Sequence, residues 1–136
     1  MKKTGIISAI ALSAIFTFSA PLMAAENTIL ESYRAAARQE NPAFKDFSST
    51  RGQTFHTAKS GDLSCASCHT ENIKAHGKHA TTGKDILPLA PSANPDRFAD
   101  AAKVEKWFKR NCNDVLKRAC TAQEKGDFIA YTLSVK

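Results

Sequence analysis

The spacing of apolar residues along the chain predicts helices separated by irregular segments. After a polar switch at Glu26, apolar residues recur at helical intervals up to the Asn41-Pro42 pair. Asn27 or Thr28 is placed to cap the start of this helix, because a side-chain oxygen there can accept from a free backbone N–H. The residue before a proline resists helical geometry, so we expect the helix to end at Asn41.

Two further helices are expected in the second half of the chain. Apolar positions from Pro95 to Phe108 predict an amphipathic helix with the proline in its first turn. The sequence Thr-x-x-Glu at residues 121–124 is a capping box, and it opens a last helix that runs to Leu133. A short break over residues 112–120 separates these two helices.

The other segments have the composition of loops. Turn residues at Ser48, Ser49 and Gly52 favour an irregular segment over residues 44–55. The stretch 77–95 is rich in glycine, proline, serine and threonine, and it predicts a long loop with at most a short helix. A loop of this length in a compact domain is usually functional. The whole pattern predicts an all-α domain of short helices wrapped around something that supplies part of the core.

Residues 1–25 have the organisation of a cleaved secretory signal. A basic start is followed by an apolar segment at 6–18, and then by Ala24 and Ala25 before the sequence turns polar. The apolar run is too short to span a membrane comfortably, so we expect cleavage and no stable membrane insertion. Residues 26–136 then form a single domain of 111 residues.

The charge of the chain is mildly basic. The formal net charge is +6 for the full sequence, and it falls to +4 once the two lysines of the signal are removed. This balance favours an acidic protein partner over nucleic acid, because the chain has no dense basic run with interleaved aromatic residues. An exported protein enters an oxidising compartment, and we expect this one to be the bacterial periplasm.

Residues 65–69 read Cys-Ala-Ser-Cys-His, which is the most specific chemical signal in the chain. Two thiols three positions apart can each add to a vinyl group of haem, so the motif predicts one haem c attached covalently at Cys65 and Cys68. His69 follows directly and is the expected proximal iron ligand. Its second ring nitrogen is expected to donate to a backbone carbonyl, for which Pro88 is a candidate. Arg97 is a candidate to hold a haem propionate.

The same Cys-x-x-Cys spacing also occurs in zinc sites and in redox-active dithiols. Zinc needs two further ligands, and Cys112 and Cys120 do not repeat the spacing. A thioredoxin-like dithiol belongs to a βαβ unit, which the pattern lacks. Haem is therefore the favoured cofactor. In an oxidising compartment we expect Cys112 and Cys120 to form a disulfide.

The far side of the iron has no obvious ligand in the sequence. Both methionines, Met1 and Met23, lie in the expected signal, so the mature chain lacks the sulfur ligand of many cytochromes c. The side chains able to reach the iron are His56, His76, His79, a lysine or an amide. The two histidines that follow the motif are expected to stay near the proximal half of the haem or at its rim.

Four segments carry a resemblance to a known family. They are Cys-Ala-Ser-Cys-His at 65–69, Ala-Asn-Pro-Asp-Arg-Phe at 93–98, Val-Glu-Lys-Trp-Phe-Lys-Arg-Asn-Cys at 104–112 and Thr-Ala-Gln-Glu-Lys-Gly-Asp-Phe at 121–128. Together they resemble the sphaeroides haem protein (SHP) family of class I-like monohaem cytochromes c. In that family an asparagine beside a disulfide cysteine is the sixth iron ligand, and it leaves on reduction to open a site for O2, NO or CO. The matching residue is Asn111, with Asn113 close enough to keep a second assignment open.

The resemblance implies an all-α, class I cytochrome c-like fold and electron transfer with a dihaem cytochrome c as donor. The sequence leaves two other functions open. One is a plain electron shuttle whose sixth ligand never leaves, and the other is an enzyme that reduces or oxidises O2, NO or a nitrogen oxide. No dedicated acid–base pair supports the enzyme. Six basic residues near the proposed opening either dock an acidic partner or form a solvated face: Lys103, Lys106, Lys109, Arg110, Lys117 and Arg118.

Overall fold

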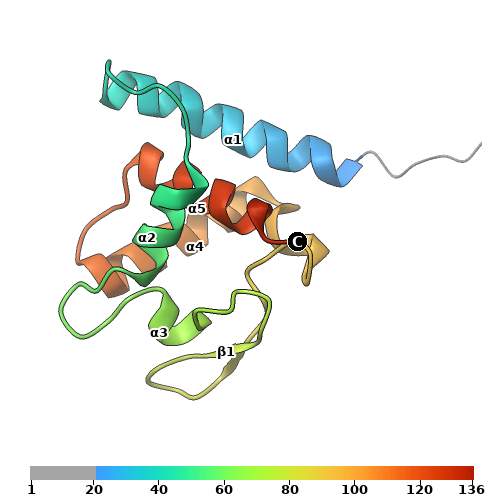
Figure 1. Cartoon of the computed structure of the whole chain (residues 1–136), viewed down its shortest axis with the longest axis vertical. Coiled ribbons are helices and arrows are strands. Elements are labelled where there is room, and N and C mark those ends of the chain that lie inside the picture. The colour runs from blue at the N-terminus through green and yellow to red at the C-terminus, as the bar shows by residue number, and fades with distance from the viewer. Residues whose placement is uncertain (1–20) are drawn as a thin grey trace, which may run out of the picture.

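The computed structural model describes residues 21–136, with side chains from Thr28 onward, and residues 1–20 of the expected signal peptide lie outside this range. The elements in chain order are α1 (Pro21–Glu40), α2 (Ser49–Thr57), α3 (Ala66–His69), β1 (Gly77–Lys78), β2 (Asp85–Ile86), the 3-10 helix η1 (Pro95–Phe98), α4 (Ala101–Leu116) and α5 (Ala122–Ser134). The two short strands pair antiparallel. In Figure 1, α1 lies at the top, α2 and α5 occupy the middle, and α3 and the β-hairpin lie at the bottom.

The close packing of α2 against α5 forms the centre of the domain. Gly52 makes it possible, because a Cβ at this position would lie 1.9 Å from the carbonyl oxygen of Asp127. The Asp127 carboxylate is 4% exposed and accepts hydrogen bonds from the Ser48 backbone N–H at 2.7 Å and from Arg51 Nε at 2.7 Å. These bonds satisfy a buried charge that would otherwise be costly, and they tie the start of α2 to the middle of α5.

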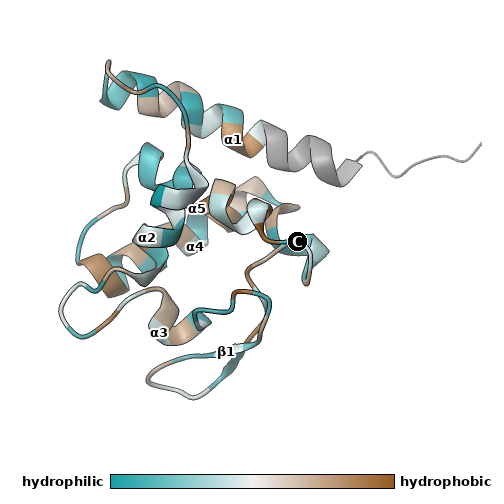
Figure 2. Cartoon of the chain, in the orientation of Figure 1, coloured by the Kyte–Doolittle hydropathy of each residue, from teal (hydrophilic) through white to brown (hydrophobic). Residues whose placement is uncertain are grey.

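Hydrophobic clusters lie around this pair of helices, and two of them contain most of the buried aromatic residues. Apolar residues alternate with polar ones along the helices (Figure 2), so each helix has one side to bury. The first cluster joins α1 to η1, α4 and α5 through Ile29, Tyr33, Phe98, Val104 and Ile129. The second consists of Ile73, Leu89, Ala90, Phe128 and Tyr131, and Phe55 and Phe108 pack against it. This second cluster brings the segment after α3 into contact with α5.

The helical fold class is confirmed, and so are two predicted helix ends. The first helix ends at Glu40, just before the Asn41-Pro42 pair, with the Asn41 N–H bonded to the Ala37 carbonyl at 2.9 Å. At the start of α5, Thr121 and Glu124 form the predicted capping box. The start of α1 differs from the prediction, because the helix begins at Pro21 and not at Asn27 or Thr28.

The loop predicted over residues 44–55 is wrong, because α2 begins at Ser49. The Ser48 side chain caps this helix by accepting from the Arg51 N–H at 3.3 Å. Gly52 marks the close approach of α5 and does not form a turn. The segment 77–95 contains a short β-hairpin that the sequence analysis did not predict.

The helix predicted from Pro95 to Phe108 is divided in two. Pro95 begins the 3-10 helix η1. Helix α4 begins at Ala101, and the Asp100 side chain caps it by accepting a hydrogen bond from the Lys103 N–H at 3.0 Å. The predicted break over 112–120 is shorter than expected, because α4 continues through Cys112 to Leu116. It ends at Lys117, which has the left-handed conformation with φ 58°.

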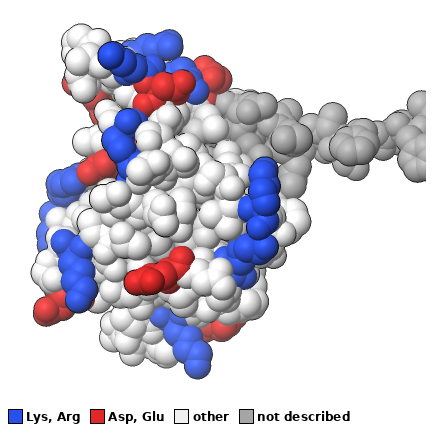
Figure 3. All heavy atoms as spheres, in the orientation of Figure 1, with Lys and Arg blue, Asp and Glu red and all other residues white. Residues whose placement is uncertain are grey.

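The surface of the described chain carries scattered charge. In the view of Figure 3, basic side chains stand mainly around the rim of the domain, and an acidic patch lies just below the middle of a face that is otherwise largely uncharged. Within residues 21–136, no helix has the length and apolar character needed to cross a membrane.

Candidate haem site

The Cys-Ala-Ser-Cys-His motif forms the single turn of α3. Ser64 and Ser67 stabilise its start reciprocally, since the Ser64 N–H donates to Ser67 Oγ at 2.9 Å and the Ser67 N–H donates to Ser64 Oγ at 3.2 Å. The His69 N–H closes the turn on the Cys65 carbonyl at 3.0 Å. Cys65 and Cys68 are both free thiols. The turn and its N-cap residue therefore present two free thiols and an imidazole within five residues of the chain.

Burial sets the protonation of these groups. It raises the pKa of the Cys65 thiol to about 11, so this sulfur is a protonated thiol at neutral pH. Burial, together with the nearby Arg97 and His56, lowers the pKa of His69 to about 4. A neutral imidazole has a free lone pair on one ring nitrogen, and this is the form that binds a metal ion.

The β-hairpin lies directly against α3. A Cβ at Gly77 would lie 2.0 Å from the Cys68 carbonyl oxygen, so only glycine allows β1 to approach this closely. The Ala80 N–H donates to Cys68 Sγ at 3.4 Å. His76 is engaged across the hairpin, where its Nδ1 lies 2.7 Å from Asp85 Oδ2. The hairpin thus covers one side of the motif.

His79 and the Pro88 carbonyl both form hydrogen bonds within this part of the chain. His79 Nδ1 accepts from the Thr82 N–H at 3.2 Å, inside the hairpin. The Pro88 carbonyl, expected to accept from His69, instead accepts from Asn94 Nδ2 at 3.1 Å and from Arg97 Nε at 3.0 Å. Arg97 is thereby directed to backbone carbonyls, and burial lowers its pKa.

His56 lies on the same side of the domain as the motif. Its side chain is fully buried, and its Nε2 is 2.8 Å from the carbonyl oxygen of Thr70, the residue after His69. The sequence analysis considered His56 as a distal iron ligand. The structure places it against the backbone that leaves α3, a position for which the sequence pattern contains no signal.

Asn111 and the two remaining cysteines lie in and beside the last turns of α4. Asn111 is half-buried, whereas Asn113 is exposed. The Asn111 amide makes no hydrogen bond with another side chain or backbone group in the described part of the chain. The next residue, Cys112, is buried and forms a disulfide with Cys120, which precedes α5. The disulfide thus attaches the helix that carries Asn111 to the start of α5.

The N-terminal half of α4 is held by a separate set of contacts. The Glu105 carboxylate accepts from Tyr33 Oη at 2.7 Å and from Lys125 Nζ at 2.6 Å. The Phe108 ring packs edge-on against Tyr33 and Phe128, at centroid distances of 6.0 and 5.7 Å. Helix α4 is therefore fixed to α1 and α5 near Glu105 and again at Cys112, with Asn111 just before the second attachment.

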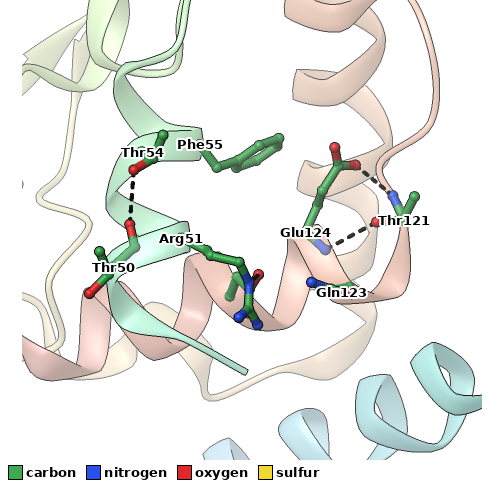
Figure 4. A pocket seen from close by; sticks show the side chains of 8 residues that line it. Thr50, Arg51, Thr54, Phe55, Thr121, Gln123 and Glu124 are labelled. Atoms are coloured by element: carbon green, nitrogen blue, oxygen red, sulfur yellow. Dashed lines mark hydrogen bonds and ion pairs between the residues drawn. The ribbon is translucent and has the colours of Figure 1, made fainter. Parts of the chain in front are cut away.

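A groove of about 450 Å3 lies between α2 and the start of α5. Figure 4 shows Phe55 and Thr54 from α2 on one side, and Thr121 and Glu124 on the other. The residues that line it do not include the cysteines and histidine of α3, or Asn111. The groove is therefore separate from the haem motif, and we do not place the cofactor there.

Comparison with known proteins was made by sequence and by structure. The family model described as a domain of unknown function (DUF1924) matches residues 42–132. Cytochrome c'' of Methylophilus methylotrophus is 45% identical over 107 residues, which cover 75% of this chain and 74% of that protein. The cytochrome c-type protein SHP of Cereibacter sphaeroides is 54% identical over 68 residues, which cover 50% of this chain and 52% of that protein. The chain belongs to the SHP/cytochrome c'' family.

Two solved structures agree with this membership. The structure of oxidised SHP, described as an oxygen-binding cytochrome c, has a TM-score of 0.69 and 39% identity, and the match covers 79% of this chain and 94% of that one. The solution structure of cytochrome c'' from Methylophilus methylotrophus, described as giving insights into haem-ligand detachment, has a TM-score of 0.72 and 39% identity. That match covers 82% of this chain and 94% of the other.

As a member of this family, the chain is a c-type cytochrome that carries a covalently attached haem c. The residues of α3 fit this cofactor, because they supply two thiols outside any disulfide and a neutral imidazole within one turn. The described residues contain no group of three or more His, Cys, Asp or Glu side chains placed to hold a metal ion.

Proposed function

We propose that Cys65 and Cys68 form the two thioethers to the haem and that His69 is the proximal iron ligand. The free state of both thiols and the neutral imidazole beside them support these roles. Bound haem supplies a redox-active iron. The protein's own part is to fix the position of His69 through the closed turn of α3 and to cover one side of the motif with the hairpin.

We further propose that Asn111 is the sixth ligand, and the observation that carries this is its position in α4. Its amide is half-buried and has no hydrogen-bond partner among the described residues, and it directly precedes the disulfide cysteine Cys112. Asn113 lies on the exposed side of the helix. Within the expected mature chain there is no methionine to compete for this position.

The chemistry of an amide ligand implies that Asn111 is released on reduction. An amide oxygen is a hard donor that suits ferric iron, whereas the soft methionine sulfur favours ferrous iron. Departure of Asn111 would open a position for a diatomic ligand such as O2, NO or CO. The descriptions of SHP as oxygen-binding and of cytochrome c'' in terms of haem-ligand detachment support this proposal.

The proposed cellular role is electron transfer in the periplasm, combined with gas binding at the reduced haem. The signal-like residues 1–25 support export. The net charge of +4 expected after cleavage favours an acidic partner, and the family resemblance implies a dihaem cytochrome c as electron donor.

Replacement of Asn111 by alanine tests the ligand assignment. We expect the ferric haem of Asn111→Ala to lose the six-coordinate spectrum of the wild type, while Asn113→Ala, a matched change two residues away, leaves it unaltered. An unchanged ferric spectrum in Asn111→Ala would refute the assignment. Titration of the reduced wild-type protein with CO tests the opening of the site. A ferrous spectrum that does not respond to CO would favour a plain electron shuttle.

A further inference from the structure

His56 is a buried titratable residue that the proposed function does not use. It lies in the last turn of α2, where it is 0% exposed, and its ring centroid is 6.0 Å from that of Phe128 and 5.8 Å from that of Tyr131. Its Nε2 lies 2.8 Å from the Thr70 carbonyl oxygen. A carbonyl only accepts hydrogen bonds, so Nε2 carries the ring hydrogen and donates the hydrogen bond to Thr70.

The other ring nitrogen of His56 is unsatisfied. Nδ1 is buried and has no hydrogen-bond partner in the described part of the chain. A side chain selected for packing alone would be apolar here, because burial of an unpaired polar atom is unfavourable. The hydrogen bond to Thr70 is therefore the feature that distinguishes His56 from an apolar residue of similar size.

Thr70 adopts a strained backbone conformation directly after His69. Its φ is 60° and its ψ is 165°, in a region that glycine adopts readily and that is unfavourable for a β-branched residue. Such a conformation persists when surrounding contacts hold it. The Thr70 hydroxyl donates to the Asn72 carbonyl at 2.8 Å, and His56 donates to the carbonyl of Thr70 itself.

We propose that His56 is a positioning residue for the proximal iron ligand. It holds the strained backbone at Thr70, and this fixes the direction in which the chain leaves α3 and hence the orientation of the His69 ring. The support for His56 is rigid, because the same face of α2 is held against α5 at Gly52. This inference rests on the proposed role of His69.

The position of His56 matters most when the distal ligand has left. With Asn111 released, His69 would be the remaining protein ligand of the iron, and its orientation would no longer be opposed by a ligand on the other side. A fixed backbone after His69 would then keep the imidazole in one orientation. Loss of the His56 hydrogen bond would allow several orientations, with a weaker and more variable iron–histidine bond.

Three variants of the haem-loaded protein test this. His56→Phe keeps a ring of similar shape and removes the donor, while His56→Gln keeps an N–H donor at the position of Nε2. Thr57→Val, on the neighbouring exposed position, is the control. The measurements are the iron–histidine stretching band of the ferrous protein by resonance Raman, the midpoint potential, and unfolding by urea.

We expect a lower and broader iron–histidine band and a shifted midpoint potential in His56→Phe, with both restored toward wild type in His56→Gln. Equal effects of the two variants, or a loss of stability with no change in band or potential, would overturn the positioning role. If the band persists after replacement of His69, the proximal assignment itself fails and not the role of His56 alone.

A background change at Thr70 provides a second test if His56→Phe folds poorly. Glycine adopts the observed conformation without strain, so Thr70→Gly should reduce the need for the bond from His56. We expect His56→Phe to shift the potential less in the Thr70→Gly background than in the wild type. An equal shift in both backgrounds would show that His56 does not act through Thr70.

Discussion

At the scale of single residues, burial sets the chemistry of the haem motif and its neighbours. The pKa of Cys65 is raised to about 11 and that of His69 is lowered to about 4 by burial, so both are uncharged in the folded domain at neutral pH. Burial also lowers the pKa of His56. An uncharged set of groups suits a site that must hold an apolar macrocycle and leave an imidazole lone pair free for iron.

The lowered pKa of His56 has a consequence for stability. Above its ordinary value of 6.5, the histidine is neutral in both the folded and the unfolded state. As the pH falls below 6.5, the unfolded state takes up a proton more readily than the folded state does. The free energy of unfolding therefore falls, by at most about 1.4 kcal/mol per pH unit for one such group.

We expect this slope between pH 6.5 and 5.5 in urea unfolding of the wild type, and a smaller slope in His56→Gln, which lacks the titrating ring. Thr57→Val, which changes the neighbouring exposed position of α2 and removes no titrating group, is the control and should retain the wild-type slope. A His56→Gln protein with the full slope would assign the pH dependence to other groups.

The haem-site residues that the sequence indicates are those contained in one short motif. Cys65, Cys68 and His69 lie within five residues of the chain, so their joint position follows from one helical turn. The relation between His56 and Thr70 depends instead on the packing of α2 against α5 and on one strained φ angle. Neither the helix packing nor the φ angle has a sequence pattern. A threonine gives no signal of a positive φ, because it is an unfavourable residue for that conformation.

At the scale of elements, the pairing of α2 with α5 determines where the haem motif lies. Gly52 allows the contact, since any Cβ there would overlap the Asp127 carbonyl. The sequence analysis interpreted this glycine as part of a turn, because close helix packing and a turn both require the same small residue. The β-hairpin was missed for a related reason, as two-residue strands are too short to show an alternating pattern.

Gly52→Ala should destabilise the protein. Alanine in a helix interior normally stabilises relative to glycine, but here its methyl group would force α2 and α5 apart. We expect a loss of about 1–3 kcal/mol in the free energy of unfolding, measured with urea. Gln53→Ala, at the next and exposed position of α2, should have little effect. A neutral or stabilising Gly52→Ala would contradict the close contact.

The disulfide between α4 and α5 is expected to affect both stability and ligation. Conversion of Cys112 and Cys120 to serine removes a short cross-link and should lower the free energy of unfolding by roughly 2–3 kcal/mol. It should also raise the fraction of ferric haem that lacks the Asn111 ligand, because the last turns of α4 lose one attachment. A ferric spectrum identical to wild type in the Cys112→Ser, Cys120→Ser protein would show that the disulfide contributes to stability and not to iron ligation.

At the scale of the whole molecule, basic side chains are scattered over the surface, and α4 with the two residues after it carries six of them. All six basic residues identified from the sequence are exposed. Arg118 is paired with Glu124, and Arg110 with Asp114, whereas Lys103, Lys106 and Lys109 have no ion-pair partner among the described residues. With Asn111 as the proposed sixth ligand, unpaired charge on this helix would attract an acidic electron donor close to the haem.

The rate of reduction by an acidic donor should therefore depend on salt and on these lysines. We expect Lys106→Glu combined with Lys109→Glu to lower the second-order rate constant about tenfold at low ionic strength, and much less at 0.5 M salt. Lys45→Glu combined with Lys136→Glu changes the net charge equally away from α4 and should have a smaller effect. Stopped-flow measurements would detect the difference, and equal effects of the two pairs would exclude docking at α4.

The single tryptophan of the chain lies one turn before Asn111 on α4. Trp107 is 43% exposed, and the Arg110 guanidinium lies over its ring at 5.6 Å from the centroid. Haem absorbs at the wavelengths that tryptophan emits, so the intensity and lifetime of this fluorescence report the distance and angle between the indole and the cofactor. The protein thus contains a built-in optical probe of α4, with which movement of this helix during a redox cycle can be followed without any added label.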